Sequence, residues 1–331
     1  MAPALHKRGR PGAANETRIN GCSRSILLDA DLAAIETKFL QGSDWTNRPS
    51  TVSYSKKFEG ICMFTRFFAA TIALVFLCSL IPETVAAQRL PVERSLQKNQ
   101  TEHGYAKIRG LTRLGKRAQR FEVRPGDCGW DSGWSDCDND RERSELYVKR
   151  DWRHGTDQWI AFSIYLPPDF KTSSRVRTTV GQVKMKGGPS GFAGGFPSEP
   201  GVFQMEMLGN RYFLRVHVLS GPFNNVRNDI ADYQLASISE LRGKWTDFAV
   251  RLNTQGSPGT LEVFKNGKQV AVHPYNQSYE PKSYYFKYGI YRSFVSRHSG
   301  PMPTQVVFID EVRMGKTYEK VAVELQKRAV D

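Results

Sequence analysis

The sequence has few cysteines and histidines, and it lacks the motifs that identify several common enzyme classes. Its 331 residues include 5 Cys and 6 His, and no Cys/His spacing is typical of a zinc site. Neither a Walker A nor a G-x-S-x-G sequence is present. The E-x-D-x-x-E pattern of sandwich-fold glycosidases is also missing. These absences argue against nucleotide-dependent catalysis, serine hydrolysis and glycoside hydrolysis by two carboxylates.

Long apolar runs are missing as well, since a membrane-spanning helix needs about 20 residues. The longest run, residues 67–82, has sixteen. Arg66 precedes it and Val85-Ala86-Ala87 follows, the pattern of a secretory signal with a small-residue cleavage site. We therefore predict a signal peptide at 63–87 that begins at Met63, an over-extended or disordered segment at 1–62, and a secreted or periplasmic protein. If translation starts at Met1, the run instead indicates a membrane anchor.

The scarce cysteines agree with export. Three of them lie before residue 88, which leaves Cys128 and Cys137 in the mature chain. Two cysteines nine apart in an exported protein predict one disulfide that closes a short loop. Two free thiols are the alternative.

Positive charge is abundant. The formal net charge is +14, and residues 88–331 carry 37 Lys/Arg and 26 Asp/Glu, a net of +11. A basic domain favours a polyanionic partner, which is a nucleic acid, an anionic membrane surface or an acidic polysaccharide. Charge alone does not choose among them.

From residue 121 onward, short β-type runs alternate with turns rich in Gly, Pro and Asn. Asn266-Gly267 predicts a type I′ hairpin, and Glu240-Leu241 a short helical turn. We interpret 88–120 as a linker or edge segment and 121–331 as one all-β domain, a jelly-roll sandwich of two antiparallel sheets. The predicted strands are 141–149, 158–166, 179–186, 202–208, 211–219, 244–253, a hairpin over 260–272, 284–292 and 305–314.

The run Tyr284–Arg292, YYFKYGIYR, carries the most chemistry. Alternate side chains of a strand share one face, so Tyr285, Lys287 and Tyr291 project together from the sheet. Gly289 interrupts this face, and a strand glycine often marks the close approach of a ligand or of another backbone.

Three other predicted strands also alternate a polar face with an apolar face. An ordinary solvent-exposed sheet is the simpler explanation. However, such a face normally mixes Lys, Glu, Thr and Ser, whereas these faces are rich in Arg, Gln, His and Tyr. The composition favours a binding groove, lined by Arg143, Glu145, Gln182, Lys184, Lys186, Arg215 and His217.

Three of these segments resemble, in the same order, the motifs R-x-E-L, Q-[IV]-H and YFKxGxYxQ of jelly-roll alginate lyases. They are ERSEL at 142–146, GQVK at 181–184 and YFKYGIYR at 285–292. The runs IAFSIYLPPDF, LEVFKNGK and VVFIDEVRMG resemble the heparin-lyase-I-like and glucuronan-lyase branch of the polysaccharide lyases. The resemblance covers roughly residues 120–316.

The resemblance implies a concanavalin-A-like fold and β-elimination from a uronate polymer. The carboxylate beside the acidic C5 proton must be neutralised, for which Arg143 and Gln182 are suited. Tyr291 matches the catalytic tyrosine of the family and would carry the proton. Lys184 stands where the motif has His, so the base is Lys184, His217 or Tyr291 itself. The predicted substrate contacts are Glu145, Lys186, Arg215, Tyr285, Lys287 and Arg292.

An exported lyase that acts as a monomer on an anionic polysaccharide is the leading hypothesis. A non-catalytic carbohydrate-binding jelly roll is the alternative, because the histidine is replaced. We expect no nucleotide or redox cofactor, and no nucleic-acid partner, since no RNA-binding signature accompanies the basic strands. Aspartates cluster at 127–140, but Arg141 and Tyr147 break the EF-hand pattern. A Ca²⁺ site there remains a less favoured reading than a disulfide-pinned loop. Membrane contact is expected only if 67–82 stays uncleaved.

Overall fold

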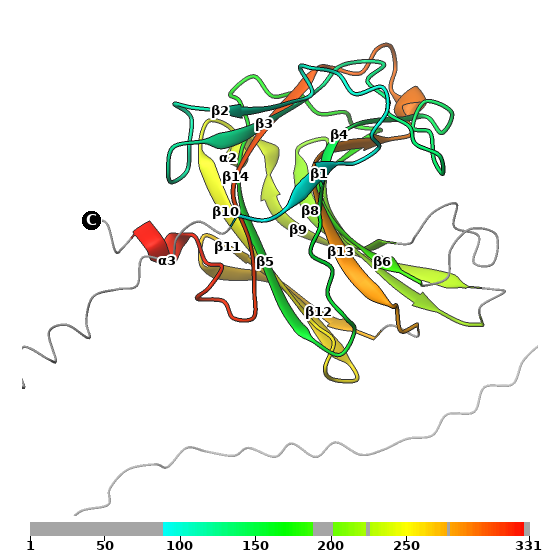
Figure 1. The fold of residues 1–331 in the computed structure, drawn as a ribbon, viewed down its shortest axis with the longest axis vertical. Coiled ribbons are helices and arrows are strands. Elements are labelled where there is room, and N and C mark those ends of the chain that lie inside the picture. The colour runs from blue at the N-terminus through cyan, green and yellow to red at the C-terminus, as the bar shows by residue number, and fades with distance from the viewer. Residues whose placement is uncertain (1–88, 188–200, 223–225, 277–278, 328–331) are drawn as a thin grey trace, which may run out of the picture. The chain divides into compact units, whose positions relative to one another are not determined.

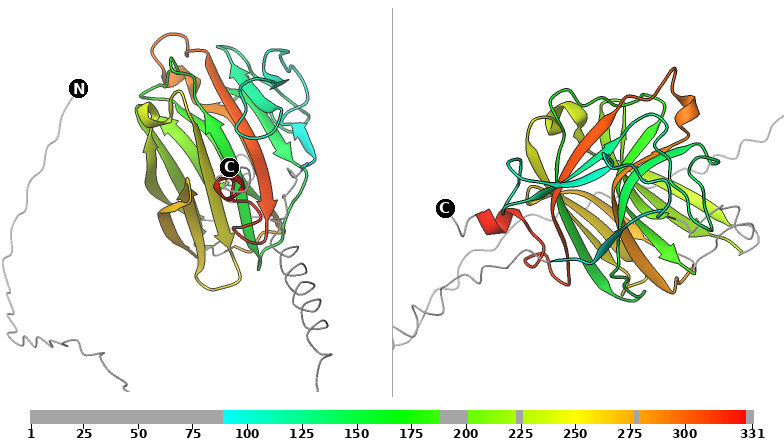
Figure 2. Two further views of the ribbon diagram at one scale, coloured as in Figure 1. Left: turned by 90° about the vertical axis from the view of Figure 1, so that its left-hand side faces the viewer. Right: turned by 45° about the horizontal axis from the view of Figure 1, so that its top comes forward.

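The chain folds into two seven-stranded antiparallel sheets that face each other, as the computed structural model shows for residues 89–187, 201–222, 226–276 and 279–327 (Figure 1). We call one the site sheet, with the strand order β1-β4-β13-β6-β7-β8-β9. The other is the back sheet, with the order β12-β11-β10-β5-β14-β3-β2. Figure 2 shows β14 of the back sheet between β5 and the β2–β3 pair.

Strand bounds follow the sequence patterns closely. The site sheet consists of β1 (Val92–Arg94), β4 (Arg141–Val148), β13 (Ser283–Ser293), β6 (Arg177–Lys186), β7 (Gly201–Leu208), β8 (Arg211–Ser220) and β9 (Arg227–Ser237). The back sheet consists of β12 (Lys268–Tyr275), β11 (Gly259–Lys265), β10 (Trp245–Asn253), β5 (Asp157–Tyr165), β14 (Gln305–Gly315), β3 (Ala118–Val123) and β2 (Tyr105–Ile108). The short helices are α2 (Ile238–Leu241), η1 (Val295–Arg297) and α3 (Glu324–Lys327).

The core lies between the sheets and is built from the apolar positions of alternating strands. On β13, the inward side chains of Tyr284, Phe286, Tyr288 and Ile290 are at most 2% exposed. The Phe286 ring stacks on Phe162 of β5 with centroids 6.2 Å apart. Burying one such side chain stabilises the fold by about 1.5–3 kcal/mol. The same alternation leaves Lys287 and Tyr291 on the outer face.

Several predictions of local structure are confirmed. The fold is an all-β sandwich of two antiparallel sheets, as the patterns predict. Asn266 and Gly267 both have positive φ, 48° and 81°, as a type I′ turn requires. The helical turn at Glu240-Leu241 is α2, whose N-cap Ser237 accepts a hydrogen bond from the Glu240 amide.

The sequence analysis missed β9, the edge strand of the site sheet. The segment RNDIADYQLAS has charged and polar residues on both faces for most of its length, and half of it is exposed. An edge strand buries little on its outer side, so its sequence shows weak alternation. The short strands β1 and β2 lie within 88–120, at the other edges of the two sheets.

The disulfide between Cys128 and Cys137 is confirmed, with Cα atoms 5.1 Å apart. Backbone hydrogen bonds tie its loop to β4, because the Arg143 amide donates to Asp127 and the Arg141 amide to Asp136. The loop is therefore anchored against the first strand of the candidate site.

Helices long and apolar enough to cross a membrane are not found among the described residues. The predicted segments 1–62 and 63–87 lie outside these residues.

Candidate functional site

Three adjacent strands, β4, β13 and β6 (Figure 1), carry Arg143, Gln182, Lys287 and Tyr291 on one face of the site sheet. Tyr291 pairs with Arg143 across β13 and β4, and Lys287 pairs with Gln182 across β13 and β6. Directly paired side chains on one face lie about 4.5–5.5 Å apart at Cβ. Residues 148 and 105 positions apart in sequence thus become neighbours.

Gly289 explains how β13 fits this arrangement. Its φ is +136°, and a Cβ there would lie 2.4 Å from the Ser144 carbonyl oxygen of β4. The pairing of β13 with β6 also shifts between Tyr288 and Tyr291. The glycine therefore admits a neighbouring backbone, one of the two explanations predicted for it, and the bulge sets the register of Tyr291.

Arg143 is held firmly by protein carboxylates. Its Nε and Nη2 donate to the two oxygens of Asp136 at 2.7 and 2.8 Å. Its Nη1 donates to Glu145 at 2.9 Å and to Ser95 at 3.2 Å. Burial opposes the charge, but Glu145 and Asp136 outweigh it and raise the pKa of the guanidinium. Four of the five N–H groups are thus used, and one on Nη2 is left for a ligand.

Glu145 lies at the centre of this cluster. It accepts hydrogen bonds from Arg143 and Gln182, and Lys287 Nζ is 3.5 Å from its Oε2. Burial alone would raise the pKa of Glu145, but Lys287 and Arg143 lower it below its usual value. Glu145 is thus a buried anion that orders three donors. Both its oxygens are engaged by these protein groups, so its predicted contact with substrate does not agree with its surroundings.

Lys287 completes the donor set. Its ammonium donates to Ser95 Oγ at 2.7 Å. Burial lowers the pKa of Lys287, although Glu145 works in the opposite direction. Each of Lys287, Gln182 and Arg143 keeps at least one N–H beyond those used in these contacts, so together they can receive a carboxylate.

Tyr291 lies beside two guanidinium groups. Its hydroxyl accepts a hydrogen bond from Arg141 Nε at 3.0 Å, and Arg143 Cζ lies 4.3 Å from the ring centroid. A phenol that accepts from a cation presents its own O–H to an outside acceptor. The phenol is thus positioned to donate a proton.

The candidate bases Lys184 and His217 lie in different places. Lys184 pairs directly with Tyr285 of β13 and lies near Glu145. His217 lies on β8, separated from β6 by β7. Its Nε2 contacts Gln204 Oε1 at 3.0 Å and its Nδ1 contacts Asn228. Burial lowers the pKa of His217 to about 4, so its imidazole is neutral and already hydrogen-bonded on both nitrogens.

Next to His217, Arg215 and Glu206 form a second charged group. Arg215 Nε and Nη2 donate to the two oxygens of Asp232 at 3.0 and 2.7 Å, and its Nε is 3.5 Å from Glu206 Oε2. Arg177 Nε lies 3.4 Å from the same oxygen. Burial raises the pKa of Glu206 to about 7 despite both arginines. We call Glu206, Arg215 and His217 the far group.

We call Arg143, Gln182 and Lys287, with the carboxylates of Asp136 and Glu145 that hold them, the clamp. Lys186 and Tyr285 lie further along the same strands, β6 and β13. Lys186 Nζ contacts Asp151 at 2.6 Å and the Tyr147 hydroxyl at 2.9 Å, and the Asp151 interaction raises the pKa of Lys186 to about 12 although partial burial opposes this. The Tyr285 and Tyr147 rings meet edge to face with centroids 5.4 Å apart. This is an aromatic and cationic surface on the same sheet face.

Arg292 must be corrected. We predicted that it contacts substrate, but its side chain is 0% exposed and points into the sandwich. It pairs with Glu142 and donates to the carbonyl oxygens of Pro303 and Arg124. The position follows from the alternation of β13, since Arg292 comes one residue after Tyr291 and faces the opposite side.

The aspartates of the loop 127–140 bind protein groups. Asp131 accepts the amides of Gly133 and Trp134, and Asp140 accepts from Ser296. In the described part of the chain, no three His, Cys, Asp or Glu side chains converge as metal ligands would. The Ca²⁺ reading has therefore gained no support.

Asp136 is the site residue that the sequence analysis did not identify. It is fully buried and also accepts the indole N–H of Trp134 at 2.8 Å. Its position beside Cys137 and shortly before β4 was the only signal available in the sequence. Ser95 and Glu206 were missed too, because nothing in their neighbourhood distinguishes them from ordinary polar residues.

Comparisons with known proteins bear on the family and the fold of this chain. The family model described as polysaccharide lyase matches residues 92–313. The endo-β-1,4-glucuronan lyase of the fungus Trichoderma reesei superposes with a TM-score of 0.56 at 16% identity, covering 71% of this chain and 98% of that one. At this identity it shows the fold.

Two further solved structures match with lower scores. A product complex of the family 7 alginate lyase A1-II′ has a TM-score of 0.46 at 13% identity, with 68% of this chain and 95% of that chain covered. The alginate lyase AlyA1 of Zobellia galactanivorans gives 0.41 at 12%, with 67% and 84% covered. No curated protein matches the sequence. The family model spans two thirds of the chain, and the chain belongs to the polysaccharide lyase family.

Proposed function

We propose that the protein is an exported lyase that cleaves a uronate-containing anionic polysaccharide by β-elimination and leaves unsaturated uronate ends. The observation that carries this proposal is the convergence of Arg143, Gln182, Lys287 and Tyr291 on one sheet face. Both the glucuronan lyase of Trichoderma reesei and the alginate lyases named above are described as acting on polymers of this chemistry. The mature domain begins after residue 87 in this proposal, and it acts as a monomer.

The reaction begins with the carboxylate of the uronate at the cleavage point. The free N–H groups of Arg143, Gln182 and Lys287 donate to it and make the adjacent C5–H more acidic. The carboxylate gains enolate character as the proton leaves, so fixed donors there stabilise the transition state more than the ground state. Glu145, Asp136 and Ser95 hold these donors and keep the clamp from reorganising.

The base takes the C5 proton, the electron pair forms the C4=C5 double bond, and the C4–O4 bond breaks. Tyr291 donates its phenolic proton to the departing O4. The base is either Lys184, two strands from Arg143 and close to Glu145, or the Tyr291 phenolate in turn. His217 fits the base role less well, since both its nitrogens are bonded and its pKa is about 4.

Single substitutions separate these bases. Lys184→Gln should lower kcat at least about 10²-fold if the ammonium's conjugate amine is the base, whereas His217→Gln should leave kcat within about threefold. A large loss in His217→Gln alone would transfer the role to the imidazole. Small losses in both variants would leave Tyr291 as the base.

No nucleotide or redox cofactor enters this scheme, because proton transfer and charge neutralisation suffice for β-elimination. The partner is the acidic polysaccharide itself, and the basic excess of the domain favours its approach.

The test is incubation of the purified mature protein with glucuronan, alginate, heparin and bacterial acidic exopolysaccharides. The expected result is growth of ultraviolet absorbance from the conjugated C4=C5 double bond on at least one polymer. Binding without any absorbance on the whole panel would contradict the proposal and favour a carbohydrate-binding module, which the replacement of His by Lys184 would then explain.

A further inference from the structure

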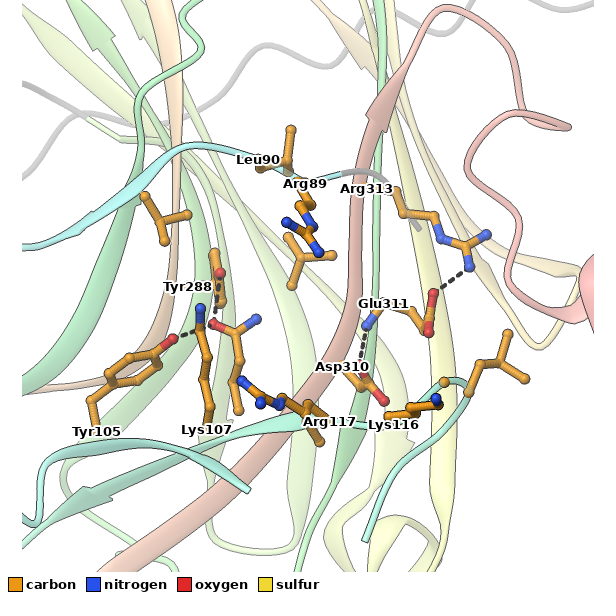
Figure 3. A pocket seen from close by; sticks show the side chains of 16 residues that line it. Arg89, Leu90, Tyr105, Lys107, Lys116, Arg117, Tyr288, Asp310, Glu311 and Arg313 are labelled. Atoms are coloured by element: carbon orange, nitrogen blue, oxygen red, sulfur yellow. Dashed lines mark hydrogen bonds and ion pairs between the residues drawn. The ribbon is translucent and has the colours of Figure 1, made fainter. Parts of the chain in front are cut away.

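A recess lies on the opposite side of β13 from the clamp. It opens between the edges where β1 of the site sheet and β2 of the back sheet lie, with a volume of about 760 Å³ (Figure 3). Its lining comes from the segment before β1, from β2 and β3 with the loop between them, and from β14. Tyr288 of β13 also lines it, one residue from Lys287. A volume of this size falls in the range of about 300–1,000 Å³ that is typical of small-molecule binding pockets.

The inner part of the recess presents hydrogen-bond donors. The hydroxyls of Tyr105 and Tyr288 both donate to Gln119 Oε1, at 3.2 and 3.0 Å. This arrangement uses the carbonyl oxygen of Gln119 and fixes the orientation of its amide. Within the described residues, the Gln119 NH₂ group has no protein acceptor. It is therefore held ready to donate to oxygen atoms of a ligand.

The rim is cationic. Arg89, Lys107, Lys116 and Arg117 line it and are exposed. No carboxylate pairs with any of the four in the part of the chain that the structure describes. Arg251, elsewhere on the domain, is by contrast paired with Asp157. Four unpaired cations around one recess produce a strong positive potential.

The two carboxylates of the recess cancel only part of this charge. Glu311 is paired with Arg313 (Figure 3). Asp310 accepts the backbone amides of Arg113 and Glu311, each at 2.8 Å, and these neutral donors leave its negative charge in place. Five cations and two carboxylates line the recess, so its net charge is +3.

We propose that this recess is an auxiliary binding site for a uronate-bearing segment of polysaccharide, separate from the catalytic face. Only donors and cations are free there, which selects an oxygen-rich anion. Leu90 and Val92 add apolar contacts for the C–H faces of sugar rings. The identity of the ligand rests on the proposed function, and the site would tether a polymer whose other segments occupy the clamp.

The test uses Tyr291→Phe protein, which blocks turnover, and a glucuronate hexasaccharide as the probe in titration calorimetry. We expect two binding sites per chain. The variant Lys107→Ser/Lys116→Ser/Arg117→Ser should retain one. The control Lys244→Ser/Lys268→Ser/Lys320→Ser removes the same charge from exposed positions elsewhere and should retain two.

Gln119→Glu provides an independent check, because a carboxylate still accepts from both phenols but repels an anion. Its melting temperature should match the parent while the second site is lost. With turnover restored, the recess variants should raise KM for polymer about tenfold and leave KM for the hexasaccharide within twofold. Three results would overturn the proposal. They are a single binding site in the Tyr291→Phe protein, loss of the second site in the lysine control as well, and full displacement of the hexasaccharide from the recess by sulfate at equal charge.

Failure of this inference is distinguishable from failure of the proposed function. Cleavage of the hexasaccharide by the wild-type protein with only one binding site refutes the auxiliary site alone. Two binding sites without cleavage of any polymer refute the lyase mechanism alone.

Discussion

The clamp around Arg143 and the far group around Glu206 lie on one sheet face and differ in how their charges are compensated. In the clamp, two carboxylates and two cations pair so closely that Arg143 and Glu145 both stay ionised. In the far group, burial dominates, so Glu206 titrates near pH 7 and His217 near pH 4. The clamp keeps its groups ionised, whereas burial in the far group favours the neutral forms of Glu206 and His217 beside the paired Arg215.

This contrast assigns the two ends different work. A preorganised set of charges can stabilise developing negative charge at a reacting carboxylate. In the far group, Arg215 is paired with Asp232 and Glu206, and the neutral His217 imidazole is suited to sugar hydroxyls. We therefore propose bond cleavage at the clamp and further sugar contacts at the far group.

The largest expected effect comes from Tyr291→Phe. Loss of the phenolic proton should reduce kcat by about 10²–10⁴-fold, with the fold retained because the ring stays. Tyr147→Phe is the matched control: it removes a hydroxyl from the same face that bonds Lys186 and Asp151, and should cost at most about tenfold. Initial rates of double-bond absorbance measure both. Equal losses of kcat in the two variants would show that the Tyr291 hydroxyl has no particular role in catalysis.

The next effect concerns Asp136, whose carboxylate holds Arg143. Asp136→Asn leaves a buried guanidinium without its bidentate partner, which should lower the free energy of unfolding by about 3–5 kcal/mol and reduce kcat/KM. Asp138→Asn, an exposed neighbour in the same loop, should change neither. Urea unfolding and steady-state kinetics test the pair. An active, stable Asp136→Asn protein would break the claim that the clamp depends on fixed charge.

A third prediction uses the pH dependence of the far group. The pKa of Glu206 is about 7 in the folded state against 4.5 ordinarily, so its contribution to stability is complete below pH 4.5 and is lost as the pH rises through 7. His217, with a pKa lowered from 6.5 to about 4, contributes fully above pH 6.5 and less as the pH falls through 4. Each change amounts to about 3 kcal/mol.

In the wild type, the change of stability with pH that Glu206 causes opposes the change that His217 causes, and single variants separate the two. Relative to wild type, Glu206→Gln should gain stability as the pH rises from 4.5 to 7, and His217→Gln should gain it as the pH falls from 6.5 to 4. Denaturant unfolding at a series of pH values measures this. If neither variant changes the dependence of stability on pH, burial does not favour the neutral forms of Glu206 and His217, and the contrast with the clamp disappears.

The smallest expected effect comes from the disulfide. Cys128→Ser/Cys137→Ser should lower the free energy of unfolding by about 2–3 kcal/mol. Because Cys137 adjoins Asp136, the same variant should also weaken the clamp and raise KM. Melting curves and steady-state kinetics check this, measured for the wild type with and without a reductant and for the variant. Unchanged kinetics would limit the disulfide to stability.

The sequence predicted the fold well because most strands alternate apolar and polar residues and end at clear turns. It also predicted that Arg143, Gln182, Lys287 and Tyr291 share a face, since the alternation of side chains along a strand determines which face of the sheet each one occupies. It failed where long-range packing decides. The role of Asp136 depends on a loop folding onto β4, and the recess at the sheet edges depends on how β1, β2 and β14 meet.

Arg292 shows the same limit within a strand. Its charge suggested a substrate contact, but the one-residue alternation of β13 places it inside, where Glu142 and two carbonyl oxygens satisfy it. The close backbone approach predicted at Gly289 is that of β4, but the register shift between β13 and β6 that accompanies it was not predicted.

The central claim is that the clamp performs elimination on a uronate. Mass spectrometry of products formed in oxygen-18-labelled water tests it most directly. Elimination predicts new non-reducing ends that are unsaturated, lighter by one water than those of a hydrolysis product and without labelled oxygen, and it predicts that these ends disappear when the uronates of the polymer are reduced to neutral sugars. Saturated non-reducing ends, or equal cleavage of the reduced polymer, would contradict it.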